Sequence, residues 1–155
     1  MKLHWVVAAC ALMAGCSSGG GGNVDDRPIE ITGLAPSYDS GSDSVDIAIN
    51  FTNISRQPLR QVQIQVQAYD SGGSLVRGGG PGGSAVLTFY GPYEVGLKVG
   101  PLIAQRLWTG SNVHCLEVAD ISVAGMDYAS THVSGAAANL LVAADTRRIC
   151  KAIAP

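Results

Sequence analysis

Charged residues are scarce in this sequence, and neither sign is in excess. Lysine and arginine number 10 against 12 aspartates and glutamates, so charged residues make up 14% of the 155 residues and the formal net charge is −2. A protein that binds a phosphate backbone needs a surplus of basic side chains, so this balance argues against a nucleic-acid partner. Apolar residues reach 46%, which supports a buried core and argues against disorder along most of the chain.

Residues that usually carry catalysis or bind metals are also few. The chain has 3 histidines, and His114, Cys115, Met126 and His132 could be combined into a copper site only without the His-x-Met or Met-rich pattern typical of one. No serine lies in a nucleophile-elbow context, and no pair of carboxylates can be placed together from the sequence. We therefore expect no enzyme activity, no cofactor and no metal site.

Two further motifs invite a functional interpretation but are better explained without one. Residues 38–44 include Asp39 and Asp43, but they lack the regular spacing and the closing glutamate of a calcium loop, so a solvated turn is favoured. Asn50 and Asn53 each begin a match to the glycosylation sequon, and we interpret both matches as chance.

Long apolar runs are missing too; residues 5–14 form a run that is too short for a permanent membrane anchor. One fixed cation precedes this run, and small residues end it before Cys16. The N-terminus resembles a bacterial lipoprotein signal peptide, in which the residue after the cleavage site is a lipid-modified cysteine. The matching residues are Leu12, Met13, Ala14, Gly15 and Cys16. Residues 7–10 fit the same pattern with a shorter apolar core, and a non-lipidated secretory signal is the other alternative.

This resemblance implies a domain organisation and an address. Residues 1–15 would be the signal peptide, residues 16–23 the lipidated Cys16 with a flexible Gly/Ser tether, and residues 24–155 the folded domain. Because Ser17 rather than aspartate follows Cys16, the implied location is the periplasmic face of the outer membrane. The membrane is then a partner through the N-terminal lipid, which several acyl chains would make effectively permanent.

The implied location determines which cysteines can form a disulfide. Cys10 leaves with the signal peptide and Cys16 carries lipid, so Cys115 and Cys150 remain as an even pair in an oxidising compartment. We predict a disulfide between them, which the chain-entropy model values at roughly 3–4 kcal/mol. Metal binding by the two cysteines is the weaker alternative, because no further cysteine or histidine lies at ligand spacing.

What the sequence does have is a strict alternation of apolar and polar residues in two central runs, 45–52 and 62–70. A period of two places alternate side chains on opposite faces of a strand, so each run predicts one buried face and one wet face. The predicted buried residues are Val45, Ile47, Ile49, Phe51, Val62, Ile64, Val66 and Ala68; the wet face of the second run carries Gln61, Gln63, Gln65 and Gln67.

Shorter segments complete the prediction of secondary structure. Strands are expected at residues 29–34, 75–76, 85–90, 97–108 and 116–126, with a break or bend at the glycines and proline of residues 91–96 and a long Gly-rich loop at residues 77–84. Residues 136–148 favour a short helix capped by Ser134 and ending at Arg147 and Arg148, although residues 140–143 could instead form a buried edge strand. The predicted fold class is an all-β antiparallel sandwich of about seven strands with a short C-terminal helix.

The segment Val66-Gln67-Ala68-Tyr69-Asp70 resembles the FxLYD family of bacterial envelope domains. That family reads strand, Asn-containing turn, proline, strand ending in Tyr-Asp, then a glycine turn, and here residues 49–53, Pro58, residues 62–70 and residues 72–73 match in that order. Val66 and Ala68 replace the family's Phe and Leu. Residues 91–96, Trp108, Cys115 and residues 121–127 also resemble a pattern in small envelope proteins. The resemblance implies an immunoglobulin-like sandwich without catalysis, and supplies no ligand.

The expected function is therefore a tethered, non-catalytic interaction or envelope-assembly module that binds another envelope protein. Tyr90, Tyr93 and Trp108 are candidates for an interaction patch, because tyrosine and tryptophan are favoured anchors at interfaces. The same three aromatics could instead fill the core. The alternative function is a periplasmic lipoprotein that binds a small ligand or a metal.

Overall fold

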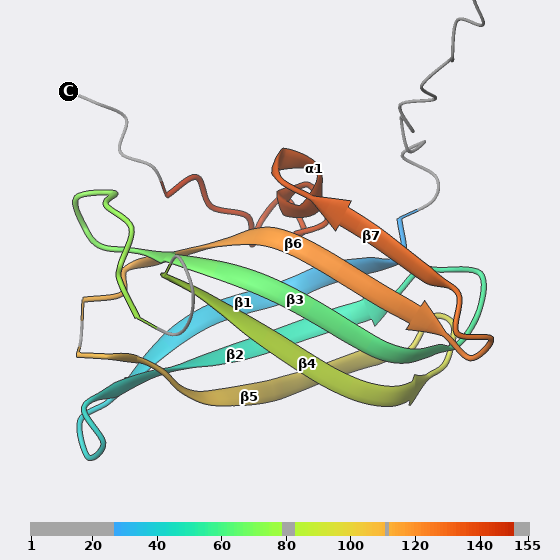
Figure 1. Cartoon of the computed structure of the whole chain (residues 1–155), viewed down its shortest axis with the longest axis horizontal. Coiled ribbons are helices and arrows are strands. Elements are labelled where there is room, and N and C mark those ends of the chain that lie inside the picture. The colour runs from blue at the N-terminus through green and yellow to red at the C-terminus, as the bar shows by residue number, and fades with distance from the viewer. Residues whose placement is uncertain (1–26, 79–82, 111, 151–155) are drawn as a thin grey trace, which may run out of the picture.

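The computed structural model describes residues 27–78, 83–110 and 112–150, which form seven strands and one short helix (Figure 1). The predicted signal peptide, Cys16 and the Gly/Ser tether lie outside the described residues. The elements are β1 (Ile29–Asp39), β2 (Ser44–Asn53), β3 (Leu59–Tyr69), β4 (Ser84–Tyr93), β5 (Lys98–Thr109), β6 (Cys115–Gly125), β7 (Ser130–Ser134) and α1 (Ala136–Asn139).

The strands form two antiparallel sheets that pack face to face as a sandwich. One sheet has the order β1-β2-β5 and the other the order β4-β3-β6-β7. The constant-type immunoglobulin sandwich has the orders 1-2-5-4 and 3-6-7, so this fold differs from it in one respect: β4 pairs with β3 instead of β5. The predicted all-β, immunoglobulin-like sandwich with a short C-terminal helix is confirmed.

The core lies between the sheets and follows the predicted alternation. Every predicted inward residue of β2 and β3 is at most 1% exposed, while the glutamines of β3 are only partly buried. Phe51 packs its ring edge-on against Tyr93 with the ring centroids 5.2 Å apart. Full burial of one such aliphatic or aromatic side chain is worth roughly 1.5–3 kcal/mol, so this double row of apolar residues stabilises the sandwich.

Three local features differ from the predicted strands. Residues 75–76 form only one isolated bridge, between Leu75 and Tyr69, rather than a strand. β4 continues past Pro92 to Tyr93 instead of ending at residue 90. β7 was not predicted, because its sequence Ser-Thr-His-Val-Ser has a single apolar residue, Val133. It pairs with β6 after the tight turn that joins the two strands.

The predicted helix over residues 136–148 is mostly wrong. The helix stops after four residues, Ser134 ends β7 instead of capping it, and the N-cap Gly135 makes no side-chain cap hydrogen bond. Arg147 and Arg148 lie beyond the helix, where they cannot favour its dipole. A single helical turn is marginal by itself, so its position depends on packing against β6 and β7.

The segment after α1 belongs to the first sheet, which the alternative strand prediction captured in part. The amide of Ile31 donates to the carbonyl of Leu141 at 2.9 Å, and the amide of Ala143 donates back to Ile31 at 2.8 Å. Val142 forms one parallel bridge with Ile31. Because Ala138, Leu141 and Val142 are buried in the core cluster, this segment closes the side of the sandwich next to β1.

Strict antiparallel order gives the sandwich two distinct ends (Figure 1). We call the end where β1 begins the N-terminal pole; it carries residues 27–28, 54–58, 94–97 and 126–129. The opposite pole carries residues 40–43, 70–78 and 112–114. Within the described part of the chain, no helix is both long and apolar enough to cross a membrane.

Candidate interaction surfaces

The outer face of β4 and β3 presents an uncharged surface beside a free strand edge. We define the β4 edge surface as Val86, Thr88 and Tyr90 of β4 with Gln65, Gln63 and Gln61, which lie opposite them on β3 in that order. Val86 is 54% exposed and Tyr90 72% exposed. Among the described strands β4 pairs only with β3, so its other edge has no strand partner there.

Two of the three glutamines of this surface, Gln63 and Gln65, are held by bonds across the strands. Gln65 Nε2 donates to Ser84 Oγ at 2.8 Å, and Gln63 Nε2 donates to Thr88 Oγ1 at 3.4 Å. Both bonds fix the amide planes while each side chain stays partly exposed. A fixed row of amides can donate and accept hydrogen bonds without the desolvation penalty of a charge, which suits a protein surface.

The three candidate aromatics do not form one patch: Trp108 and Tyr93 fill the core, which was the other interpretation of them, and Tyr90 is exposed. Trp108 is 2% exposed, with its Nε1 donating to the carbonyl of Gly83 at 3.4 Å. Tyr93 is buried against Phe51, and burial raises the pKa of its phenol above the ordinary value of 10.0. Tyr90 alone faces solvent. Residues 90 and 93 are separated by an odd number within one strand, so the period of two places them on opposite faces.

Asn53 organises the N-terminal pole, and the sequence analysis gave it no role. It is fully buried at the end of β2. Its Nδ2 donates to the carbonyls of Tyr93 at 2.9 Å and Gln57 at 3.1 Å, and its Oδ1 accepts from the amide and hydroxyl of Ser55 at 3.0 and 2.7 Å. Its own amide donates to Leu97 at 3.1 Å. The Asn53 side chain therefore connects the loop before β3 with the end of β4, and its backbone amide adds the loop before β5.

A cleft of about 440 Å³ opens at the same pole. It lies between the chain start at Arg27 and Pro28, the loop that carries Ile54 and Arg56, and the ends of β6 and β7 at Val123 and Thr131. Among the described residues that line it there are two arginines and no carboxylate. The cleft therefore combines apolar walls with cationic groups, an arrangement suited to an anionic group attached to an apolar body.

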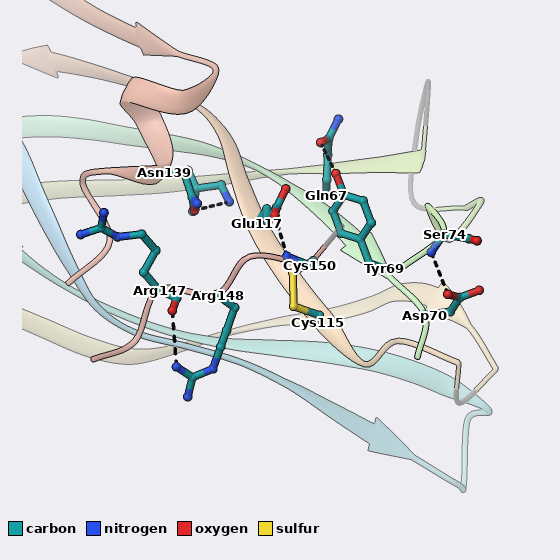
Figure 2. Close-up of a disulfide and its surroundings, with 11 residues drawn as sticks. Gln67, Tyr69, Asp70, Ser74, Cys115, Glu117, Asn139, Arg147, Arg148 and Cys150 are labelled. Atoms are coloured by element: carbon teal, nitrogen blue, oxygen red, sulfur yellow. Dashed lines mark hydrogen bonds between the residues drawn. A yellow bond between two sulfur atoms is a disulfide. The ribbon is translucent and has the colours of Figure 1, made fainter. Parts of the chain in front are cut away.

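The predicted disulfide is confirmed. Cys115 and Cys150 are joined with an S–S length of 2.05 Å and a Cα–Cα distance of 5.6 Å (Figure 2). The amide of Cys150 also donates to Glu117 Oε1 at 2.7 Å, so two links hold the C-terminal segment to β6. Burial raises the pKa of the neighbouring Tyr69, with a further contribution from the charge of Glu117. The Tyr69 hydroxyl donates to Gln67 Oε1 at 3.0 Å.

The acidic turn at the opposite pole uses its carboxylates internally. Asp39 accepts from Ser42 Oγ at 2.7 Å and from the amide of Gly41 at 2.9 Å, and these hydrogen bonds lower the pKa of Asp39 below its ordinary 3.8. Asp43 accepts from the Tyr38 hydroxyl at 2.8 Å. The carboxylates therefore stabilise the turn, as a solvated turn requires.

The residues considered for copper are not brought together. Cys115 is oxidised in the disulfide, and Met126 follows the far end of the strand that Cys115 begins. His132 pairs with Asp120, its Nε2 2.6 Å from the carboxylate Oδ2. Across the ranges given above, no three or more His, Cys, Asp or Glu side chains cluster in a way that could hold a metal ion.

Comparison with protein-family models, with curated proteins and with solved structures finds no significant match for this chain. The geometry of the surfaces therefore carries the functional argument.

Proposed function

We propose that this protein is a lipid-anchored, non-catalytic interaction module at the periplasmic face of the outer membrane, and that it binds another envelope protein by strand addition along β4. The anchor and the address are supported by the match of residues 12–16 to a lipoprotein signal. The mode of binding is supported by the β4 edge surface. Kinship with FxLYD domains is part of the same proposal and is supported by the order of motifs from residue 49 to residue 73.

The observation that carries the proposal is that the open edge of β4 is unguarded. Soluble proteins protect free edges with charged side chains, proline or bulges, because unpaired amides and carbonyls attract other strands. β4 has the sequence SAVLTFYGPY, with no charged residue and with Pro92 only near its end. Of the other edge strands, β5 carries Lys98, Pro101 and Arg106, and β7 has only five residues. An extended partner can add a strand to an exposed sheet edge of this kind.

The side chains beside the edge supply selectivity. Strand addition gains affinity from main-chain hydrogen bonds and specificity from the alternate side chains that flank them. Val86 and Tyr90 would provide apolar and aromatic contacts, and the glutamine row of β3 would provide hydrogen bonds. Tyrosine is an effective anchor because it offers a large contact area with few rotatable bonds.

Site-specific photocrosslinking in intact cells tests this proposal. A photoreactive residue placed at Tyr90 or Val86 of the full-length protein should give a discrete adduct with an envelope protein, and a matched control at Ile103 on β5, which is also exposed, should not. The substitution Val86→Lys adds a charge to the edge and should abolish the adduct formed from Tyr90. An adduct with a second copy of this chain, or equal adducts from β4 and β5, would contradict the proposal.

A further inference from the structure

We propose that the N-terminal pole is a membrane-contact surface that lies against an anionic phospholipid leaflet, so that the domain stands on the membrane with a fixed orientation. This inference rests on the proposed lipid attachment at Cys16. It goes further because a lipid anchor alone leaves the orientation of the domain open. The surface consists of the exposed tips of three loops and the arginine-lined cleft, which lies between the chain start, the loop after β2 and the ends of β6 and β7.

The loop tips concentrate exposed apolar side chains at this pole. Met126 is 55% exposed and Tyr128 is 74% exposed, both in the connection between β6 and β7. Val95 and Leu97 are exposed between β4 and β5, and Ile54 is exposed between β2 and β3. The amide of Ile54 donates to Pro28 and the amide of Asn53 donates to Leu97, so the loop after β2 is held to the chain start and to the loop before β5. Large apolar side chains gathered on one exposed end mark an interaction site.

Tyr128 has the geometry of an interfacial anchor. Its φ of 67° lies in the left-handed region that L-residues other than glycine rarely adopt. The Arg60 guanidinium lies 4.1 Å from the centroid of the Tyr128 ring. The backbone amide of Tyr128 donates to the carbonyl of Gly125 at 3.1 Å. These contacts hold an amphipathic ring out toward solvent beside a cation. Aromatic rings of this kind are enriched at the headgroup level of membranes.

Charge favours an anionic leaflet at the cleft. Arg27 and Arg56 line it without a lining carboxylate. The pole as a whole has a near balance of charge, with four basic and three acidic residues: Arg27, Arg56, Arg60 and Lys98, and Glu30, Glu94 and Asp127. The opposite pole has Asp39, Asp43 and Asp70 against Arg77 and Arg106, a near balance with one more acidic than basic group. The cleft is thus the place where a lipid phosphate is attracted, and the opposite pole is turned away from the same surface.

Covalent geometry limits how far this pole can be from lipid. Ten residues separate Cys16 from Arg27, and a chain of that length spans at most about 35 Å even when fully extended. The strands add a further separation of roughly 35 Å between the poles, at about 3.3 Å per residue. The N-terminal pole therefore experiences a high effective concentration of lipid, and weak contacts suffice to orient the domain.

Fluorescence quenching in vesicles tests the orientation. The full-length lipidated protein is reconstituted into phosphatidylethanolamine/phosphatidylglycerol vesicles that contain phospholipids brominated in the upper acyl chain. Met126→Trp should lose most of its added emission to the bromines, whereas the matched control Leu75→Trp at the opposite pole should keep it. Both positions are exposed, and the buried Trp108 gives the same background in each variant. Tyr128→Trp provides a second reporter in case Met126→Trp fails to fold.

Arginine variants test the role of the cleft. With the Met126→Trp reporter, Arg27→Gln with Arg56→Gln should weaken contact in these vesicles by roughly fivefold for each arginine, and Arg77→Gln should leave it unchanged. Quenching in vesicles without the anionic lipid should be weak from the start. Equal quenching of Met126→Trp and Leu75→Trp, or no quenching of either in protein that floats with the vesicles, would overturn the inference and leave the anchor intact.

Two further outcomes separate the inference from its alternatives. Protein that does not float with vesicles lacks the lipid anchor, which overturns the proposed function and this inference together. If inorganic phosphate raises the melting temperature of the protein through Arg27 and Arg56 while Met126→Trp stays unquenched, the cleft binds a soluble anion and the inference is wrong.

Discussion

At the scale of single residues, the N-terminal pole depends on one amide. Asn53 uses both donors and both acceptor positions of its side chain, and all four partners lie in its own pole. No other side chain of similar size offers two donors and two acceptors without charge. Asn53 also begins one of the two sequon matches. In the folded protein its side-chain nitrogen is buried and already donates two hydrogen bonds, so it is not accessible for glycosylation.

We predict that Asn53→Ala lowers the free energy of unfolding by about 2–3 kcal/mol, because the buried carbonyl of Tyr93 and the amide of Ser55 lose their partner. The matched control is Asn112→Ala, which removes the same atoms from an exposed loop position and should change stability by less than about 0.5 kcal/mol. Urea denaturation of both variants provides the measurement. A loss in Asn53→Ala no larger than that of Asn112→Ala would show that the amide does not organise the pole.

At the scale of elements, the prediction was right for strands whose own sequence alternates apolar and polar residues. Residues 45–52 of β2 and 62–68 of β3 alternate apolar and polar residues with Ala48 as the one exception, and burial follows that alternation. β7 could not be found this way, because its place depends on pairing with β6 and not on its own apolar content. The segment after α1 was misassigned for a related reason: Leu141 and Val142 are buried by β1, a partner 110 residues away in sequence.

The same limit applies to the surfaces. The disulfide could be predicted, because cysteine pairing follows from counting and compartment. The β4 edge could not be identified as an open edge, since sheet order is a property of the whole topology. Trp108 and Tyr93 were open candidates for surface or core, and the direction in which a side chain points depends on register, which the sequence of β4 and β5 leaves ambiguous.

The C-terminal segment gives a prediction at the element scale. Replacing both Cys115 and Cys150 with alanine should lower the free energy of unfolding by about 3–4 kcal/mol, the loop-closure value for the 35-residue separation. Because the segment also pairs with β1, the amide of Ile31 should become less protected from hydrogen exchange. Urea denaturation and native-state exchange measure the two effects. The wild-type protein under reducing conditions is the matched control and should behave as the double variant does.

At the scale of the whole molecule, two buried phenols couple the fold to alkaline pH. Burial raises the pKa of both Tyr69 and Tyr93 above 10.0, so the unfolded chain loses these protons at lower pH than the folded chain does. The stabilisation that comes from keeping both phenols neutral is complete below pH 10 and is lost as the pH rises through their folded pKa values.

We therefore predict that the urea midpoint falls as the pH is raised above 10, and that Tyr93→Phe makes this decline shallower. Wild type and Tyr93→Phe should differ little at neutral pH, where the phenol is neutral in both states, which provides the internal control. Urea titrations along a pH series measure the slope. An unchanged slope in Tyr93→Phe would mean that the Tyr93 phenol does not contribute.

The pairing of the C-terminal segment with β1 has a consequence for self-association. With residues 141–143 bonded to Ile31 and β7 only five residues long, the long unpaired strands β4 and β5 share one flank of the sandwich (Figure 1). A copy that joined through this flank would use it up and offer no second one. A pair that used both edges, β4 against β5 and β5 against β4, would be closed, and growth by this route would halt at two copies.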